Sequence, residues 1–519
     1  MATIASPRAG RREWVGLAVI ALPCLLYSMD LTVLYLAVPS LTADLEPSST
    51  ELLWITDIYG FFLAGFLITM GTLGDRIGRR RLLLVGAAAF AGASVLAALS
   101  VSVEMLIVSR ALLGVAAATL APSTLSLIRN MFLDSKQRTL AIGIWAMSFS
   151  VGAAIGPLLG GLLLEFFWWG SVFLLALPVM ALLLALGPRL LPEFRDPSAG
   201  RLDVVSAGMS VIAVLAVVYG LKRIAESGLG WAAAISILAG LGVGLSFVRR
   251  QRALAEPMLD LKLFRSPTFS AALAANTLSL AITFGIFLFI AQYLQLVLGL
   301  SPLEAGLWTV PSSGGFIAGS LLAPALVRRF RPAHVIAGGL LLTAVGLGLL
   351  TRVDGAGVAA VVAGSVVVAL GVAPAVTLGT DLIVGCVPPE RAGAASGISE
   401  TGAELGGALG IAVLGSIGVA VYRSQIHDAI PAGALTEESE AVRNTLGAAG
   451  EAVERLPEAL GATLLETAQE AFTQGLQVAA GAGVVVALAT AGLVALLLRP
   501  LSADSGSEGD AAGACEEAA

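Results

Sequence analysis

Asp30 is the first residue whose surroundings point to chemistry, because it lies inside an apolar run. The run 14–38 would span roughly 37 Å as a helix, at about 1.5 Å per residue, against a hydrocarbon core of about 30 Å. Asp30 is too far from either end to reach water. Holding a carboxylate there costs on the order of 2.5–3.5 kcal/mol on insertion scales, so the sequence predicts a functional site. The alternative is a packing carboxylate that is hydrogen-bonded to a neighbouring helix.

Three further carboxylates in apolar runs could join Asp30. Asp57 begins a later run and would lie about five residues, roughly 8 Å, below the outer surface, where it could instead cap its helix. Glu400 and Glu404 are four residues apart, so they share one helix face, and packing is their alternative role. Asp381 lies close to an inner helix end, which is compatible with surface capping or with a gate.

Carboxylates in such positions could exchange protons for cations. A carboxylate in low dielectric holds its proton more tightly, whereas a nearby cation favours the ionised form. One group can therefore bind a proton or a cationic molecule but does not favour both together, which is a minimal antiport mechanism. Aromatic rings at Tyr59, Trp145 and Tyr293 could receive flat cations by cation–π contact. For each ring singly, packing is the commoner role.

The composition places these residues in a membrane protein. The chain of 519 residues is 57% hydrophobic and 13% charged, whereas a soluble protein carries about 25% charged residues. Long unbroken apolar runs exclude the alternating segments of a transmembrane barrel. The predicted fold class is therefore all-α and polytopic. Nucleic-acid binding has no support, and with two histidines and three well-separated cysteines we expect no metal site and no cofactor.

The apolar runs predict about fourteen membrane-spanning helices. Their expected limits are 14–38, 52–72, 82–101, 105–128, 139–164, 169–187, 203–221, 231–248, 269–298, 304–326, 334–351, 357–384, 393–421 and 475–498. The pattern is six helices, two helices and six helices.

Basic residues set the expected orientation, since loops rich in Lys and Arg stay in the cytoplasm. With both termini in the cytoplasm, roughly 23 of the 30 Lys and Arg residues fall in inner segments, and Lys222 and Arg223 are the main exceptions. The expected organisation is a cytoplasmic tail 1–13, a six-helix bundle 14–190, two inserted helices 200–250, a six-helix bundle 266–500 that includes a long outer loop 422–474, and a disordered acidic tail 501–519. Helical spacing of apolar residues within the outer loop predicts short amphipathic helices there.

A glycine-rich basic loop follows the second run and reads Gly-Thr-Leu-Gly-Asp-Arg-Ile-Gly-Arg-Arg-Arg from 71 to 81. Its glycines permit a tight turn, and Asp75 can form ion pairs with Arg76 and Arg79 at the mouth of the bundle. A positive-inside loop explains the arginines but not this pattern. The chain here strongly resembles the major facilitator superfamily, whose hallmark is this loop. Arg110, within the fourth run, resembles the buried arginine of that superfamily.

The fifth run carries a second motif of the superfamily, Gly-Ala-Ala-Ile-Gly-Pro-Leu-Leu-Gly-Gly from 152 to 161. It resembles the signature of the antiporters rather than that of the symporters. Gly152, Gly156 and Gly160 repeat every four residues and form a smooth face for close helix contact. Pro157 frees a backbone carbonyl and bends the helix.

Four more segments resemble the fourteen-span drug:proton antiporters, and within them the branch that exports quaternary ammonium compounds, methyl viologen and cationic dyes. They are 29–33, 54–59, 168–174 and 400–406. The chain departs from the family at Tyr35, where Asn is usual, and in the tenth run, which lacks an acidic residue. The second-half counterpart of the glycine-rich basic loop, Ala323 to Arg331, has no Asp.

The resemblance implies two six-helix bundles plus two inserted helices, which rock to expose one site to each face in turn. It implies a monomeric, proton-coupled multidrug exporter of lipophilic cations in the bacterial cytoplasmic membrane, with protons, small molecules and the lipid bilayer as partners. The conformational motifs would be Asp75, Arg76, Arg79, Arg110 and the fifth-run glycines. One alternative is a facilitator that exports an anionic or neutral metabolite or antibiotic. A membrane-embedded enzyme or a receptor is disfavoured, because no catalytic constellation or soluble domain is present.

Overall fold

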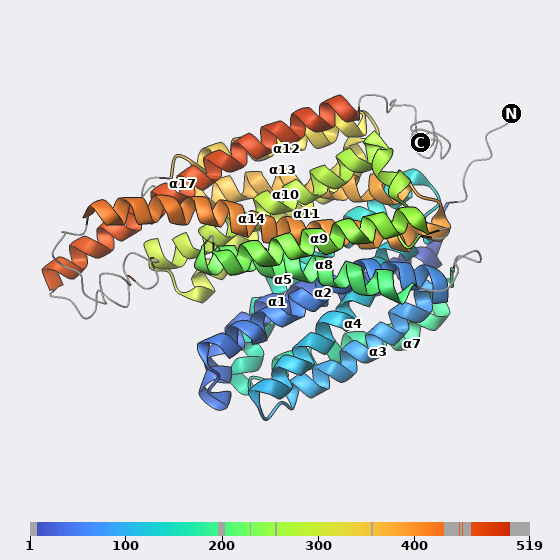
Figure 1. Cartoon of the computed structure of the whole chain (residues 1–519), viewed down its shortest axis with the longest axis horizontal. Helices are drawn as coiled ribbons and strands as arrows, with labels where there is room; N and C mark the ends of the chain where they lie inside the picture. The colour runs from blue at the N-terminus through green and yellow to red at the C-terminus, as the bar shows by residue number, and fades with distance from the viewer. Residues whose placement is uncertain are drawn as a thin grey trace.

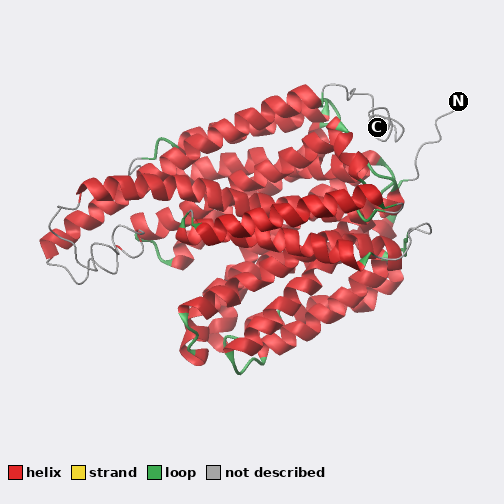
Figure 2. Ribbon diagram, viewed as in Figure 1, coloured by secondary structure: helices red, strands yellow, loops and turns green. Residues whose placement is uncertain are grey.

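The regular structure of the described residues is helical throughout (Figure 2). The computed structural model describes residues 8–195, 203–228, 230–254, 257–353, 357–429, 446, 449 and 458–498. This agrees with the predicted all-α fold class.

The first half of the chain contains the helices α1 to α7. Their bounds are α1 Arg11–Leu45, α2 Ser49–Ile77, α3 Arg79–Ala98, α4 Val103–Met131, α5 Ser135–Phe166, α6 Ser171–Leu174 and α7 Ala176–Leu190. The short α6 and the longer α7 together form the sixth spanning stretch.

Two inserted helices and the second half follow. Their bounds are α8 Val204–Ser227, α9 Trp231–Ala253, α10 Pro267–Gln292, α11 Pro302–Leu326, α12 Pro332–Leu350, α13 Val358–Gly385, α14 Ala392–Ala429 and α17 Glu458–Leu497. A π-helical turn, Tyr293–Val297, continues α10, and 3-10 turns at Leu261–Arg265 and Pro389–Arg391 precede α10 and α14.

Thirteen of the helical stretches in the described residues are long and apolar enough to cross a membrane. The remaining predicted span corresponds to α11, which contains Pro311, Pro324 and several small polar residues. This helix packs against α5 and α13, so it belongs to the bundle although it is less apolar. The chain is therefore a multi-pass membrane protein.

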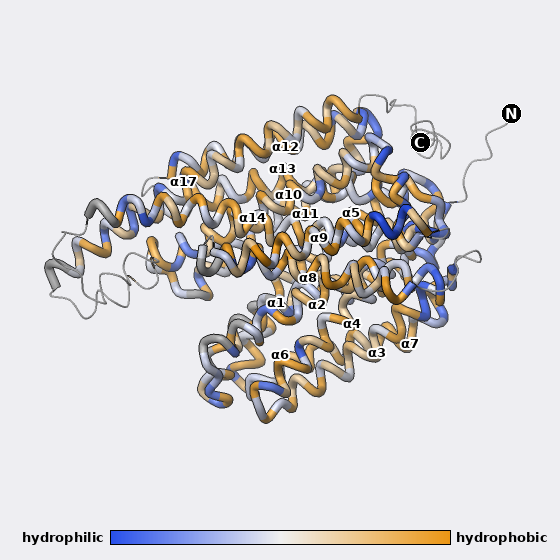
Figure 3. The backbone as a smooth tube through the Cα atoms, in the orientation of Figure 1, coloured by the Kyte–Doolittle hydropathy of each residue, from blue (hydrophilic) through white to orange (hydrophobic). Residues whose placement is uncertain are grey.

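The two halves lie side by side, and the inserted helices lie where they meet (Figure 1). α8 contacts both α2 and α14. Arginines gather at one end of the bundle, where α2 turns into α3, α4 into α5 and α13 into α14, and this end is hydrophilic in Figure 3. We call it the basic end. From there the ribbons of the halves diverge toward the opposite end.

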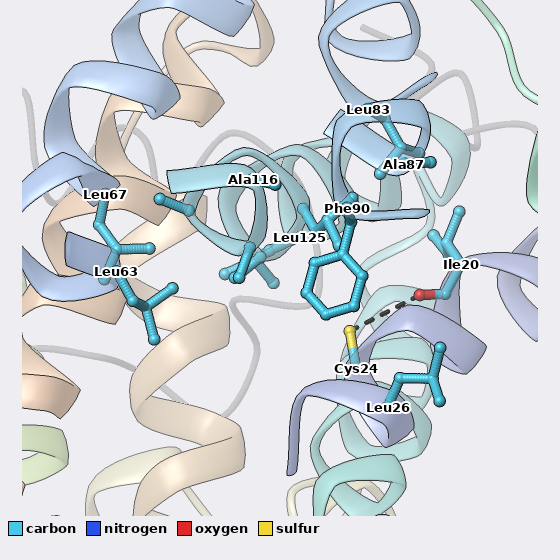
Figure 4. Packing of buried hydrophobic residues seen from close by; sticks show 14 of the residues in the cluster. Ile20, Cys24, Leu26, Leu63, Leu67, Leu83, Ala87, Phe90, Ala116 and Leu125 are labelled. Atoms are coloured by element: carbon cyan, nitrogen blue, oxygen red, sulfur yellow. Dashed lines mark hydrogen bonds between the residues drawn. The ribbon is translucent and has the colours of Figure 1, made fainter. Parts of the chain in front are cut away.

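Small residues allow the helices of the first half to pack closely. A Cβ atom on Gly114 of α4 would lie 2.4 Å from the carbonyl oxygen of Tyr59, so the backbones of α2 and α4 touch there. In Figure 4 the ring of Phe90 lies over Cys24, whose thiol donates to the Ile20 carbonyl at 3.6 Å. These contacts set the register of α1, α2 and α4, which carry Asp30, Tyr59 and Arg110.

The predicted outer loop 422–474 is shorter in the structure than expected. α14 continues to Ala429, and α17 already begins at Glu458. Helices can extend past an apolar span when their polar faces meet water, and Gln425 of α14 hydrogen-bonds to Gln474 of α17. The helical spacing seen in the sequence thus belongs in part to α17. Most of 430–457, and the tail 501–519, lie outside the described residues.

Candidate functional site

Asp30 is bound to Arg110 in the interior of the first half. The Arg110 Nη1 atom donates to Asp30 Oδ2 at 2.5 Å, and its Nε atom donates to the Ile55 carbonyl at 3.2 Å. The Arg110 side chain is fully buried, and that of Asp30 is 13% exposed. From the sequence we predict that Asp30 is a binding group and that Arg110 belongs to a conformational motif. In the structure the two residues form one ion pair between α1 and α4.

Two tyrosines extend this ion pair toward the second half. The guanidinium of Arg110 lies 4.8 Å from the ring centroid of Tyr59, which is fully buried on α2. The Tyr59 ring centroid is 6.3 Å from that of Tyr27 on α1. The Tyr27 hydroxyl then donates to Glu404 of α14. A continuous polar and aromatic series therefore runs from one half to the other.

Glu400 and Glu404 are half-buried on the same face of α14. Glu404 is held by the Tyr27 hydroxyl. Among the residues that the structure describes, Glu400 forms no ion pair and no hydrogen bond through its side chain. Two carboxylates one helical turn apart repel each other when both are ionised, so a proton or a cation between them is stabilising.

Asp57 is paired with a lysine from the inserted helices. The Nζ atom of Lys222 on α8 binds Asp57 Oδ1 and lies 4.8 Å from the ring centroid of Phe61. The side chains are 24% exposed for Asp57 and 30% for Lys222. The expected orientation places the basic residue Lys222 on the outer side of the membrane, and the pair gives its charge a carboxylate partner there.

At the basic end, the glycine-rich basic loop makes a latch between the halves. Asp75 Oδ1 accepts from Arg79 Nη2 at 2.7 Å and from the Gly393 amide at 2.9 Å, and Asp75 Oδ2 accepts from the Ala394 amide at 2.8 Å. These amides begin α14, where the helix dipole favours a negative charge. Arg79 Nη2 also donates to the Pro389 carbonyl at 2.6 Å. We call this set of contacts the Asp75 latch.

A second contact between the halves lies at the same end. Asp381 of α13 accepts from Arg138 Nε at 2.8 Å and from the Thr139 hydroxyl at 2.5 Å, both on α5. We call it the Asp381 latch. Because it joins α13 to α5, Asp381 is a contact between the halves rather than a surface cap.

The glycine face of α5 packs directly against α1. Cβ atoms on Gly152 and Gly156 would lie 2.1 Å from the Leu25 carbonyl oxygen and 2.2 Å from the Thr32 hydroxyl, and one on Gly160 would lie 2.8 Å from a methyl of Val33. This close contact sets the position of α1 on both sides of Asp30. The backbone of Pro157 lies within α5, but its side chain is outside the described residues.

Other predicted residues lie in more ordinary surroundings. Trp145 is buried and donates from Nε1 to the Thr124 hydroxyl at 3.1 Å. Tyr293 is fully buried in the hydrophobic core of the second half. Arg76 lies in the last turn of α2, next to Asp75. The structure thus places Tyr59 beside the guanidinium that binds Asp30, whereas it surrounds Tyr293 with core residues.

The space beside Asp30 is small. A cavity of about 20 Å³ is lined by Met29, Asp30, Phe90 and Phe173 among others, which is room for about one water molecule. Sites for drug-sized ligands measure about 300–1,000 Å³. The latched conformation therefore presents ion pairs at Asp30 rather than a preformed drug pocket.

A family model described as the Major Facilitator Superfamily matches residues 20–411. The chain belongs to the major facilitator superfamily. It is 46% identical over 498 residues to the "Multidrug efflux pump LfrA" of Mycolicibacterium smegmatis, covering 96% of this chain and 98% of that protein. It is 36% identical to the "Methyl viologen resistance protein SmvA" of Salmonella typhimurium, covering 94% of this chain and 97% of that protein.

A solved transporter structure has the same fold. The human organic anion transporter MFSD10 (TETRAN) superposes with a TM-score of 0.59 at 15% identity, covering 93% of this chain and 99% of that chain. The family model and the relatives confirm the predicted superfamily, and the chain is a membrane-embedded transporter of small molecules rather than an enzyme.

Sequence reasoning did not find the partners of three residues in the site. Lys222 was treated only as an exception to the positive-inside rule, although a lysine within an apolar helix needs a carboxylate partner. Tyr27 lies near Asp30 in sequence, but its hydrogen bond to Glu404 depends on packing of α1 against α14. The role of Asp381 was left open, because a residue near a helix end can cap, gate or do both.

Proposed function

We propose that this superfamily member is a proton-coupled multidrug exporter that exchanges protons for lipophilic cations. The observation that carries the proposal is the hydrogen bond from Tyr27 of the first half to Glu404 of the second. It connects the Asp30–Arg110 pair with Glu400 and Glu404 across the interface that must open and close during alternating access.

Glu400 is the carboxylate best suited to the exchange itself. Asp30 is held by Arg110 and Asp57 by Lys222, whereas Glu400 has no basic partner among the described residues. A carboxylate without a counter-ion in a half-buried position takes up a proton or a cation, and not both at once. The other three carboxylates would then take part indirectly, through the groups that already bind them: Arg110 for Asp30, Lys222 for Asp57 and Tyr27 for Glu404.

The charges balance for such an exchange. Moving a monocation out against an inside-negative potential costs about 2.3 kcal/mol per 100 mV. An entering proton recovers this amount, so one-for-one exchange would be driven by the pH gradient alone. Exchange of two protons for one cation would also use the voltage.

The relatives support a cationic cargo and a bacterial cytoplasmic membrane. LfrA is a multidrug efflux pump, and SmvA is a resistance protein for methyl viologen, which is an organic dication. We infer that both termini and the basic end face the cytoplasm, because the basic loops gather there. MFSD10 has the same fold and transports organic anions, so the fold leaves the charge of the cargo to experiment.

Transport by the purified protein in proteoliposomes tests the proposal. An imposed pH gradient should drive accumulation of ethidium but not of an anionic dye of similar size, with protons moving in the opposite direction. Glu400→Gln should abolish the driven transport. Glu470→Gln makes the same chemical change at an exposed position of α17 and should leave it unchanged. Full activity of Glu400→Gln, or transport of the anion alone, would contradict the proposal.

A further inference from the structure

The inserted helix α8 lies antiparallel along α2, and the two helices contact each other at four levels. The Thr69 and Ser210 hydroxyls are 3.3 Å apart nearest the basic end. Further out, Leu215 packs on Gly65. Beyond that, a small apolar cluster joins Phe61 and Val218 to residues of α14, so α8 covers the junction between the two halves.

The fourth level is ionic. Lys222, one helical turn beyond Val218, places its ammonium against the Asp57 carboxylate and 4.8 Å from the ring centroid of Phe61. The apolar seam thus ends at a point where a carboxylate and an aromatic ring of α2 both contact one positive charge of α8.

These are the groups that an organic cation would bind. A carboxylate neutralises its charge, and an aromatic face within about 6 Å attracts it. In this structure the lysine ammonium takes that place. The side chains of the pair are 24–30% exposed, and partly exposed ion pairs add little to stability. A role as a structural anchor for α8 is therefore weak, since the three inner levels already hold the helix.

We propose that Lys222 is a tethered cation that occupies a subsite formed by Asp57 and Phe61 and must be displaced by a cationic substrate. This inference rests on the proposed function, and it makes Lys222 a specificity-determining residue. The flexible lysine stem can swing away without moving α8. The inserted helices would then set a threshold of affinity that a cation has to exceed before it binds.

Binding of tetraphenylphosphonium to the purified full-length protein tests this inference. This monocation has no hydrogen-bond donors, so it reports charge and aromatic contact. Lys222→Gln should lower its Kd about fivefold, because the competitor is gone, and Lys222→Arg should stay within twofold of the unmodified protein. Arg223→Gln removes the same charge from the neighbouring position on α8, and it should change the Kd less than twofold. In an Asp57→Asn background the gain from Lys222→Gln should disappear.

The outcomes separate this inference from the proposed function. An unchanged or higher Kd in Lys222→Gln, an equal gain in Arg223→Gln, or a gain that persists with Asp57→Asn would each overturn the tethered-cation role while cation binding stands. Absence of tetraphenylphosphonium binding to the unmodified, folded protein would remove the cationic substrate, and the tethered-cation role with it.

Discussion

The Asp75 latch and the Asp381 latch both join the first half to the second half at the basic end, but they do so with different chemical groups. The Asp75 latch joins α2 to α14 through a buried ion pair, two backbone amides and two backbone carbonyls. The Asp381 latch joins α13 to α5 through two side-chain donors. The second-half counterpart of the glycine-rich basic loop, Ala323 to Arg331, has no acidic residue, and the carboxylate of this latch comes from α13.

The difference shows where the strength of a contact between the halves comes from. Backbone amides at a helix start cannot rotate away, and the dipole of α14 adds to their attraction for Asp75. Side chains such as Arg138 and Thr139 lose conformational freedom when they bind. The Asp75 latch should therefore hold the basic end closed, and the Asp381 latch should add to it.

Asp75→Asn should open the basic end most. It leaves Arg79 buried without its counter-ion, which costs about 3 kcal/mol, or roughly 100-fold in the population of the closed state. The measurement is hydrogen–deuterium exchange in residues 389–396, which contain the two amides bound by Asp75. Asp203→Asn, at the basic end but within the inserted pair, should leave that exchange unchanged. Equal exchange in both variants would remove Asp75 from the latch.

Gly393→Ala should weaken the same latch from the side of α14. The added Cβ would lie 2.4 Å from Asp75 Oδ1 and 2.5 Å from the Gly71 carbonyl oxygen, so the two helices must move apart. Overpacking of this kind costs about 2 kcal/mol, or roughly 30-fold. The same exchange experiment measures it. The matched control is Gly415→Ala on α14, where the Cβ meets nothing within 4 Å, and an equal effect of the two variants would contradict the close contact.

Asp381→Asn should have a smaller effect. An asparagine oxygen can still accept from Arg138, and its amide can donate to Thr139. Arg138 also loses its counter-ion, but its side chain is 8% exposed against 1% for Arg79, so we expect a smaller loss of about 1 kcal/mol, or roughly fivefold. Exchange in residues 135–143 and 381–388 measures this loss. If Asp381→Asn opens the basic end as much as Asp75→Asn does, the ranking of the two latches is wrong.

Arg138→Lys should have the smallest effect. Asp381 is contacted by a single nitrogen of Arg138, and a lysine ammonium can supply one donor and the same charge, so the change should stay within about twofold. Arg79→Lys is the comparison, because Arg79 contacts Asp75 and two carbonyls at once, and lysine cannot reproduce that fork. Ethidium transport by the two variants, at equal reconstituted amounts, should differ at least tenfold. Equal activities would show that the geometry of Arg79 is unimportant.

Much of the fold follows from local patterns, and the site follows from them only in part. The glycine-rich basic loop and the fifth-run glycines indicated the superfamily, which the family comparison confirmed. Asp30, Asp57, Glu400 and Glu404 were singled out because each lies in an apolar run. Their partners could not be derived, since Asp57 and Lys222 are 165 residues apart and Tyr27 and Glu404 are 377 apart.

The physical reason for this division lies in how a helix behaves in lipid. A spanning helix satisfies its own backbone hydrogen bonds, so its length, polarity and charged residues can be deduced from consecutive residues alone. Which charge meets which depends on the rotation and register of neighbouring helices, and small residues such as Gly114 and Gly156 set these through contacts between distant segments. The sequence alone therefore establishes that carboxylates lie in apolar helices. Packing decides that Asp30 pairs with Arg110, that Asp57 pairs with Lys222, and that Glu400 pairs with neither of these two bases.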